Sequence, residues 1–332
     1  MEKVTGIKSV DFKIKALGHG VVNWNGPTDV NGLINGNVKK LQNHSMPKLR
    51  GYSNKRFKPD GTYSLKFADD VDFSKTPLYI SQNCIRNHLF RDQALLDIQD
   101  PEVARNMDRL LCSITGLVRG YVIPATENKR TSALLITDFI DQKRNGNYEQ
   151  MGRSGSKEKK PTKSGEEKSN SLFSKTTFGD TEYIGFGSIS IEQLQFISLS
   201  DKFSRRAMVI NNNTEGLDLA RKVMDYLNKI GITDKAKADY HSNYVRRGAI
   251  FDIGEEGILL NDTAIGILVN ETLDRLINLN IRQAKGYMYV DSVEVDYNDG
   301  SSGKDMLRIM TNPGAIKVNK GDSEYAKYFK GV

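Results

Sequence analysis

The chain has 332 residues, a length that suits one elaborated domain or two modest ones. It carries 48 Lys and Arg residues against 41 Asp and Glu residues, and 38% of its residues are hydrophobic, so a core can form while much of the chain lies in polar loops. No apolar run approaches the roughly 20 residues of a membrane span, and residues 1–15 contain no apolar signal core. Two cysteines, Cys84 and Cys112, exclude a disulfide scaffold and a cysteine-rich zinc site. These features predict a cytoplasmic protein with no membrane partner, able to bind a polyanion.

The first expected elements are a strand and two helices. Residues 10–16 alternate between apolar and polar side chains, which is typical of a half-buried strand, and we expect this strand to end at Gly18-His19-Gly20. The sequence Asn25-Gly26-Pro27 should then break the chain. Residues 80–98 have the spacing of a helix with Ser81 as its N-cap. Residues 107–118 predict another helix, or a helix that runs into a strand.

The second half of the chain mixes both types of element. Residues 183–199 contain strand-like stretches, residues 216–230 and 262–279 predict amphipathic helices, and residues 244–251 predict a strand. Alternation over residues 287–297 predicts one more strand, with these side chains on a common face: Tyr287, Tyr289, Val293, Val295 and Tyr297. Because helices and strands alternate irregularly, with long insertions, an α+β fold is favoured over a regular βαβ array.

Positive charge is concentrated between residues 29 and 66, where eight Lys and Arg residues face two acidic residues, a net charge of +6. Isolated aromatic residues, Tyr52, Phe57 and Tyr63, lie in the same stretch. Cations neutralise phosphates and aromatic faces stack on unpaired bases. The basic inserted loop, residues 29–76, is therefore a candidate for binding single-stranded nucleic acid. The alternative is a solvated loop whose charges only keep the protein soluble.

A second polar segment, residues 145–170, has almost no apolar side chains and holds six cations against four acids. Such a segment buries too little surface to offset its ordering entropy, so we predict a disordered insertion in the free protein. It is either an inert linker or a finger that becomes ordered on a partner.

Motifs for nucleotide or metal chemistry are missing. Asn23 stands where a dinucleotide fingerprint that begins at Gly18 needs its third glycine, and no phosphate-binding loop occurs. The four histidines lack the close spacing of metal ligands. We therefore assign no cofactor, no metal and no catalytic residue. His19 and His44 flank the basic loop and could serve as acid and base in RNA cleavage only if the fold brought them together.

Two motifs are more specific. The segment Pro-Lys-Leu-Arg-Gly, residues 47–51, is similar to the Pro-x-(Ser)-Leu-Lys-Gly loop common in proteins of the RAMP superfamily. The segment Tyr-Ile-Ser-Gln-Asn-Cys-Ile-Arg, residues 79–86, resembles the Ile-Ser-Ser-Gln-x-Leu-Lys-Arg segment that opens the first helix in backbone subunits of CRISPR Cascade complexes, which belong to this superfamily. Five positions correspond to that motif: Ile80, Ser81, Asn83, Ile85 and Arg86. Asn87 replaces the arginine that follows, which removes one cation.

Weaker motifs follow in the order that the family has. Residues 191–196 look like its Gly-Pro-Val-Gln-Phe strand without the Gly-Pro, and residues 244–251 look like a divergent form of the strand that bears Tyr-x-x-x-Gly-Leu-Tyr. The resemblance thus touches most of the chain. Among the branches, the chain looks most like the backbone subunit of the minimal type I-F variant.

This resemblance implies an RRM-like (ferredoxin-like) palm with long finger and thumb insertions, in one elaborated domain over residues 1–332. It implies a non-catalytic subunit that binds guide RNA (crRNA) and polymerises along it in a type I CRISPR interference complex. Its partners would be the guide RNA, neighbouring copies of itself and other Cascade subunits. The target nucleic acid would be met through pairing with the guide.

The resemblance also implies RNA-binding residues. Arg86 would neutralise a guide phosphate, with Ser81 and Asn83 donating hydrogen bonds nearby, while Lys48 and Arg50 would hold the RNA backbone. The alternative is that Ser81 only caps the helix and the cations lie on a solvated surface.

Three further residues are candidates. Trp24, the only tryptophan, could stack on a base or bury against the palm. Arg246 and Arg247 are adjacent on an expected strand, so they should point to opposite faces and at most one should contact RNA.

Three other functions stay open. A RAMP endoribonuclease that cuts repeat or target RNA usually carries a glycine-rich loop near its C-terminus, whereas the glycines here are scattered after residue 299. A type III target-slicing subunit would use a loop aspartate, for which Asp29 is the candidate. The last alternative is an RNA-binding module unrelated to CRISPR.

Overall fold

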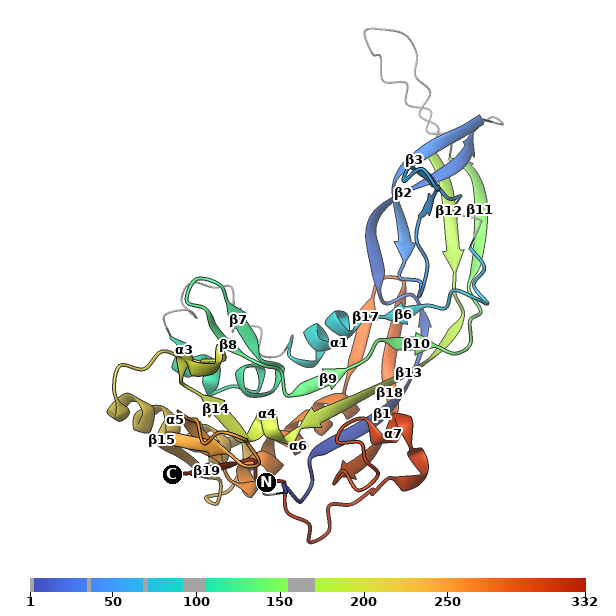
Figure 1. Cartoon of the computed structure of the whole chain (residues 1–332). Helices are drawn as coiled ribbons and strands as arrows, with labels where there is room; N and C mark the ends of the chain where they lie inside the picture. Colours follow the sequence, from blue (N-terminus) through green and yellow to red (C-terminus); the bar gives the residue numbers. More distant parts are fainter. Residues whose placement is uncertain (1–2, 35–36, 68–70, 92–105, 155–170) are drawn as a thin grey trace.

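The structure is a computed structural model that describes residues 3–34, 37–67, 71–91, 106–154 and 171–332. Its largest sheet has seven antiparallel strands (Figure 1). Their order is β17 (Asn280–Gln283), β18 (Gly286–Asn298), β1 (Ser9–Gly20), β13 (Asp180–Ser190), β10 (Phe139–Asp141) and β6 (Tyr79–Ile80), and β9 (Leu134–Ile136) also pairs with β13. The α+β class is confirmed.

A smaller antiparallel sheet and two long helices complete the core. The sheet order is β14 (Phe196–Ser198), β16 (Gly254–Leu260), β15 (Ala238–Arg246) and β19 (Phe329–Gly331). Helices α5 (Asn213–Gly231) and α6 (Asp262–Ile277) pack on each other, α5 also packs on β15, and α6 also packs on β18. Each begins at an asparagine N-cap whose side chain accepts a backbone N–H bond. The helices predicted over residues 216–230 and 262–279 are confirmed.

The remaining helices are short. They are α1 (Gln82–Leu89), α3 (Met107–Leu111), α4 (Ile191–Gln195) and α7 (Arg308–Thr311), with the π-helical turn η3 (Thr115–Arg119) and the 3₁₀ turns η4 (Asp201–Phe203) and η5 (Pro313–Ala315). Of the helix predicted over residues 80–98, α1 covers residues 82–89 and ends at its C-cap Phe90, while residues 92–105 lie outside the described part. The strand expected over residues 191–196 is wrong for residues 191–195, where the Ser190 hydroxyl accepts the Gln193 N–H and caps α4, and β14 begins at Phe196.

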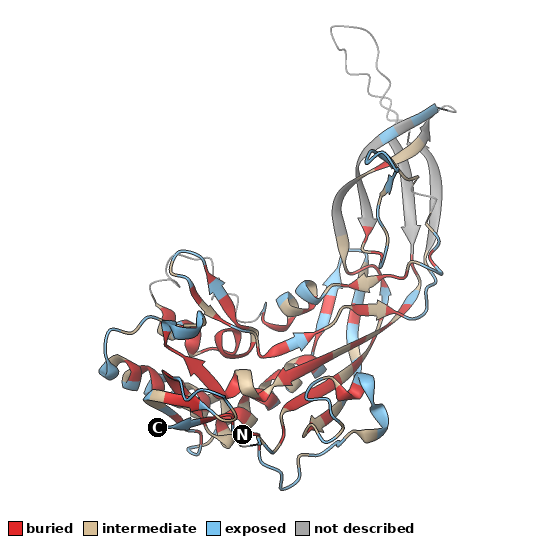
Figure 2. Ribbon diagram, in the orientation of Figure 1, coloured by how far each residue is buried: buried red, intermediate tan, exposed pale blue. Residues whose placement is uncertain are grey.

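Strand β1 confirms the alternation predicted for residues 10–16. Val10, Phe12, Ile14 and Ala16 are buried, and their cross-strand partners in β18 lie on the same face. Figure 2 shows the buried residues gathered in this sheet and in the helices that cover it. Within the described residues, no helix is both long and apolar enough to cross a membrane.

The predicted common face over residues 287–297 is wrong. The pairing of β18 with β1 shifts by one residue between Lys15 and Ala16, so Asp291 is left out of the register. Such a bulge reverses the side-chain alternation. Tyr287 and Tyr289 therefore lie on the opposite face from three side chains with which they were grouped, Val293, Val295 and Tyr297.

Hairpins occupy most of the segment predicted as a basic loop. They are β2 (Trp24–Ile34) with β3 (Asn37–Pro47), and β4 (Lys55–Phe57) with β5 (Tyr63–Leu65). The expected chain break at Asn25-Gly26-Pro27 is absent, because the register of β2 and β3 shifts between Trp24 and Pro27 and accommodates the proline within the strand.

Two more hairpins are β7 (Tyr121–Ile123) with β8 (Asn128–Arg130), and β11 (Asn147–Ser154) with β12 (Ser171–Thr177). Of the segment predicted to be disordered, residues 147–154 form strand β11, and residues 155–170 lie outside the described part. In Figure 1, β2–β3 and β11–β12 rise from one end of the large sheet. That end is defined by His19 of β1, which pairs with Asp180 of β13 and Tyr287 of β18.

The strand predicted over residues 244–251 is displaced. Strand β15 ends at Arg246, and the chain turns at Gly248, whose φ of +75° lies in the left-handed region that favours glycine. The turn leaves the apolar side chains of Ile250 and Phe251 exposed.

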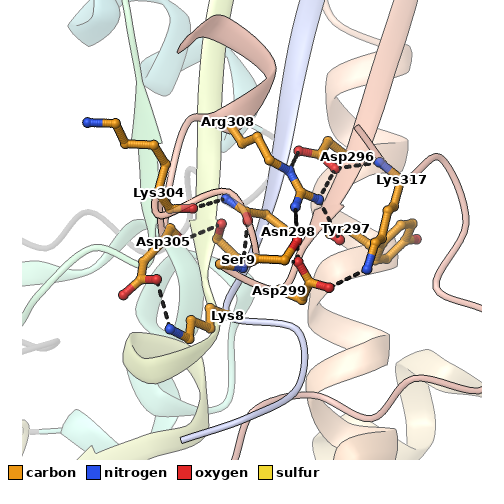
Figure 3. Close-up of polar contacts among 12 residues, drawn as sticks. Lys8, Ser9, Asp296, Tyr297, Asn298, Asp299, Lys304, Asp305, Arg308 and Lys317 are labelled. Carbon is orange, nitrogen blue, oxygen red and sulfur yellow. Dashed lines mark hydrogen bonds and ion pairs between the residues drawn. The ribbon is translucent and has the colours of Figure 1, made fainter. Parts of the chain in front are cut away.

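The other end of β1 is closed by a buried polar network (Figure 3). Asp11 accepts hydrogen bonds from the backbone N–H of Arg308 at 2.7 Å and from the side chain of Asn298 at 3.0 Å. Arg308 donates to both carboxylate oxygens of Asp296, at 2.9 and 2.6 Å, and to Asp299 at 3.0 Å. The side chains of Arg308 and Asp296 are both 0% exposed, so the C-terminal segment is fixed over this part of the sheet.

Candidate RNA-binding surface

The two most specific sequence motifs lie against each other. Leu49 and Leu78 form an antiparallel bridge, the Tyr79 N–H donates to the carbonyl of Lys48 at 3.1 Å, and the Arg50 N–H donates to the carbonyl of Pro77 at 2.9 Å. Segments about 30 residues apart in the chain therefore form one surface beside α1.

Helix α1 begins at this junction. The Ser81 hydroxyl accepts the Cys84 N–H at 3.4 Å and is also within 3.4 Å of the Asn23 side-chain amide, so it acts as the N-cap. Ile85 and Leu89 are buried, whereas Asn83 is exposed. The capping role that was the alternative for Ser81 is thus observed, and the exposed side chain of Asn83 is accessible to a ligand.

The charge of Lys48 acts on Cys84, in the first turn of α1. Burial raises the pKa of the Cys84 thiol, and the positive charge of Lys48 opposes that rise.

Arg50 has an intramolecular partner that the sequence did not indicate. Its guanidinium donates to one carboxylate oxygen of Asp138, and the other oxygen accepts the Gln82 N–H at 2.9 Å. Arg50 also lies 5.8 Å from the ring centroid of Tyr79, and its side chain is 52% exposed. Asp138 lies 88 residues from Arg50, and nothing in the local sequence indicates this pairing.

Arg86 is half-buried and anchored at its tip. It donates to the Ser132 hydroxyl at 2.8 Å and to the carbonyl of Leu134. Burial lowers the pKa of Arg86, and the neighbouring charge of Arg119 lowers it further. No carboxylate among the described residues pairs with Arg86 or Arg119, and the two like charges lie close enough to act on each other. Arg119 was missed because its proximity to Arg86 arises only in the fold.

Trp24 is only partly buried against the core. Its indole N–H donates to the carbonyl of Val21 at 3.2 Å, and the Lys285 ammonium lies 5.3 Å from its ring centroid. Trp24 pairs with Pro47 across β2 and β3, so it adjoins the Lys48 motif. Burial and stacking on a base are both compatible with this position.

Arg246 and Arg247 lie elsewhere, at the end of β15 in the smaller sheet. Arg246 donates to Glu192 at 2.6 Å and lies 5.7 Å from the ring centroid of Tyr328. The Arg247 N–H bonds the carbonyl of Tyr328 at 2.7 Å. The structure thus gathers six of the eight candidates, and it does not bring these two arginines to the same surface.

Cations and aromatic side chains do alternate in the β4–β5 hairpin. The Lys55 ammonium lies 4.2 Å from the ring centroid of Tyr63, and the ring centroids of Phe57 and Tyr63 lie 6.1 Å apart. Phe57 and Tyr63 remain exposed. The hairpin therefore presents apolar rings and positive charge together, as single-stranded nucleic acid binders do.

The residues considered for catalysis were His19, His44 and Asp29. His19 contacts Asp180 at 3.0 Å, and the side chain of His44 lies outside the described part. Asp29 pairs with Lys40 at 2.7 Å. Across the described ranges, no three His, Cys, Asp or Glu side chains are grouped so as to hold a metal ion.

The surface around α1 thus combines exposed amide groups with cations, which suits phosphate contacts without base-specific recognition. Comparison with known protein families agrees with the motifs. Residues 6–332 match the family model described as type I-Fv CRISPR-associated protein Cas7fv-like. No curated protein matches the chain. Because the match covers nearly the whole sequence, the chain belongs to this Cas7fv-like family of type I CRISPR systems, whose members are backbone subunits of Cascade complexes.

Proposed function

We propose that this protein is the non-catalytic backbone subunit that binds crRNA in a type I-F variant Cascade complex and polymerises along it. The observation that carries the proposal is the junction of the two motifs at the start of α1, which brings the segment with Lys48 and Arg50 beside the helix that contains Arg86. Neighbouring copies and other Cascade subunits are its proposed protein partners, and the target nucleic acid is met through guide pairing.

The sheet topology supports an RRM-like palm. In chain order, β1, α1, β10, β13, α6 and β18 follow the β-α-β-β-α-β pattern of ferredoxin-like folds. In space, β18 lies beside β1, β1 beside β13, and β13 beside β10, which is the ferredoxin-like order of fourth, first, third and second strand. The hairpins β2–β3 and β11–β12 are the proposed insertions into this palm.

The salt dependence of guide binding tests the surface. Each phosphate neutralised on a single strand contributes about 0.7 to the slope of log affinity against log salt. Lys48→Gln, Arg50→Gln and Arg86→Gln together should flatten the slope by about two units if each side chain meets one phosphate.

A charge-matched control removes three exposed lysines elsewhere: Lys229→Gln, Lys235→Gln and Lys327→Gln. It should leave the slope nearly unchanged. An equal change in both folded triple variants would mean that net charge, rather than this surface, attracts the RNA, and the assignment would fail.

Guides of increasing length test polymerisation. Sedimentation of complexes should show copies added in steps as the guide lengthens, and the bound guide should stay intact. A fixed stoichiometry at every length would exclude the filament, and cleavage of the guide or of a complementary RNA would favour the nuclease alternatives.

A further inference from the structure

A second surface, at the turn between β17 and β18, is not part of the motif-built site. Cross-strand pairing places Arg282, Tyr287 and His19 in one row over three adjacent strands. The next row contains Asn280, Tyr289 and Leu17. Directly opposite residues share a face of the sheet, so these two rows form one continuous surface.

The bulge at Asp291 creates this surface. It turns Tyr287 and Tyr289 away from the helix-covered face, and the two side chains are 50% and 47% exposed. The rings of Tyr287 and His19 lie 6.3 Å apart with their planes 25° from parallel, within the range of stacked aromatic pairs. Two exposed tyrosines two residues apart, beside a parallel histidine ring, leave aromatic faces directed toward solvent.

The surface is hollowed and positive. A cavity of about 550 Å³ lies at the turn, lined by these rings together with Arg282 and Lys285, and no carboxylate is among its lining residues. Within the described part of the chain, neither Arg282 nor Lys285 has an ion pair. The nearest acid in the row is Asp180, which contacts His19 at 3.0 Å on the side away from β18.

Beside the cavity, the backbone of the β17–β18 turn lies very close to the end of β1. Gly20 has a φ of +71°, and a Cβ there would lie 2.3 Å from the carbonyl of Lys285. Gly286 would place a Cβ 2.5 Å from the Val21 nitrogen. The Lys285 carbonyl accepts the Val21 N–H at 3.2 Å, and the Lys285 side chain extends over Trp24. The turn is thereby joined to the segment that leads into the candidate RNA-binding surface.

We infer that the surface formed by His19, Tyr287 and Tyr289, with Arg282 and Lys285 at its rim, is a stacking subsite for unpaired nucleobases. Tyrosine rings stack on any base, and the two cations meet the flanking phosphates. This inference rests on the proposed crRNA binding and extends it, because it adds base contacts at a position that the two motifs do not reach.

The test compares guide affinity in aromatic and aliphatic variants of the full chain. Loss of one stacked base weakens binding by about 5- to 150-fold. Tyr287→Leu with Tyr289→Leu should therefore raise the Kd for a single-stranded guide by at least about fivefold, while the salt slope changes little. Tyr287→Phe with Tyr289→Phe keeps the rings and should bind like the unmodified chain. Phe251→Leu, at an exposed aromatic residue on the β15–β16 turn, is the matched control.

Photocrosslinking adds a readout that a folding defect does not mimic. A guide that carries 5-iodouridine should crosslink to Tyr287 or Tyr289 on irradiation. If the guide binds, the leucine pair keeps full affinity and no crosslink forms at either tyrosine, the subsite is wrong while crRNA binding stands. If the unmodified chain does not bind guide RNA at all, the proposed function and the subsite both fail.

Discussion

One face of the large sheet is buried at one end of β1 and open to solvent at the other. At one end, Asp11 is buried beneath the C-terminal segment and surrounded by hydrogen-bond donors. At the other end, His19 points into an open hollow beside Tyr287. Asp11 and His19 occupy equivalent positions in the alternation, so the strand alone does not decide which is covered.

The difference lies in how each end satisfies its charges. Arg308 has carboxylate partners on two sides, and its hydrogen bond with Asp296 raises its pKa. Arg282 and Lys285 have no carboxylate partner within the described residues. A buried charge that lacks a partner is costly, whereas an exposed one is available to a ligand. The closed end of β1, around Asp11 and Arg308, should therefore determine the stability of the fold. The open end, around His19 and Arg282, should determine the binding of guide RNA.

Arg308→Ala gives the largest expected effect. It leaves the buried Asp296 carboxylate without its partner, so the free energy of unfolding should fall by about 3–5 kcal/mol. Arg282→Ala, at an exposed position on the other end of the same face, should change it by less than about 0.5 kcal/mol. Urea denaturation of both variants measures the two effects.

Guide affinity should show the reverse order. Arg308→Lys, which keeps the charge but loses the two-point contact with Asp296, serves if Arg308→Ala does not fold. Folded Arg308→Lys should bind guide RNA like the unmodified chain, whereas Arg282→Ala should bind more weakly. Equal effects of the two substitutions on stability would contradict the division between the ends.

The sequence predicted the elements whose pattern is local. Alternation identified β1, helical spacing identified α5 and α6, and the motifs identified the residues that gather around α1. Each motif keeps its own residues together along the chain, but the bridge between Leu49 and Leu78 that joins the two motifs arises only in the fold. RNA contact by these side chains stays a prediction.

The side chains that contact Arg50 and Arg86, and the sheet face on which Tyr287 and Tyr289 lie, could not be predicted. Asp138 pairs with Arg50 from the loop between β9 and β10, and Arg119 approaches Arg86 only through packing. The bulge at Asp291 reversed the expected face of Tyr287 and Tyr289, since one extra residue puts the strand positions before it out of phase with those after it. Alternation in one strand contains no information about the register of its neighbour, so the stacking surface was grouped with core residues.

Arg50 is ion-paired, like Arg308 at the closed end of β1, but its side chain is also exposed, like that of Arg282 at the open end. Asp138→Asn removes the negative charge but keeps an oxygen that can accept the Gln82 N–H. Arg50 should then be available to a phosphate, so guide affinity at low salt should rise by a few-fold and the salt slope should steepen by up to about 0.7. Titrations at several salt concentrations measure both quantities. Asp138→Asn combined with Arg50→Gln is the control, and it should abolish the gain.

The smallest expected effect is the pH dependence of the closed end, at Asp299. Burial opposes ionisation of this carboxyl group, but hydrogen bonds from Lys317, Ser301 and Arg308 outweigh it and hold its pKa well below the usual value of 3.8. A carboxyl group with a lowered pKa in the folded state stabilises the fold above its ordinary pKa, and this contribution is lost as the pH falls toward the folded value.

Asp299→Asn should therefore lower the free energy of unfolding by about 1 kcal/mol or less near pH 7, since the side chain is partly exposed. The difference from the unmodified chain should stay constant down to about pH 5 and shrink below about pH 4. Urea denaturation across this range measures it, with Asp252→Asn, at an exposed carboxylate on the β15–β16 turn, as the control. A difference that grew on acidification would mean that the ionised carboxylate does not stabilise the network. The closed end would then owe its order to Arg308 and Asp296 alone.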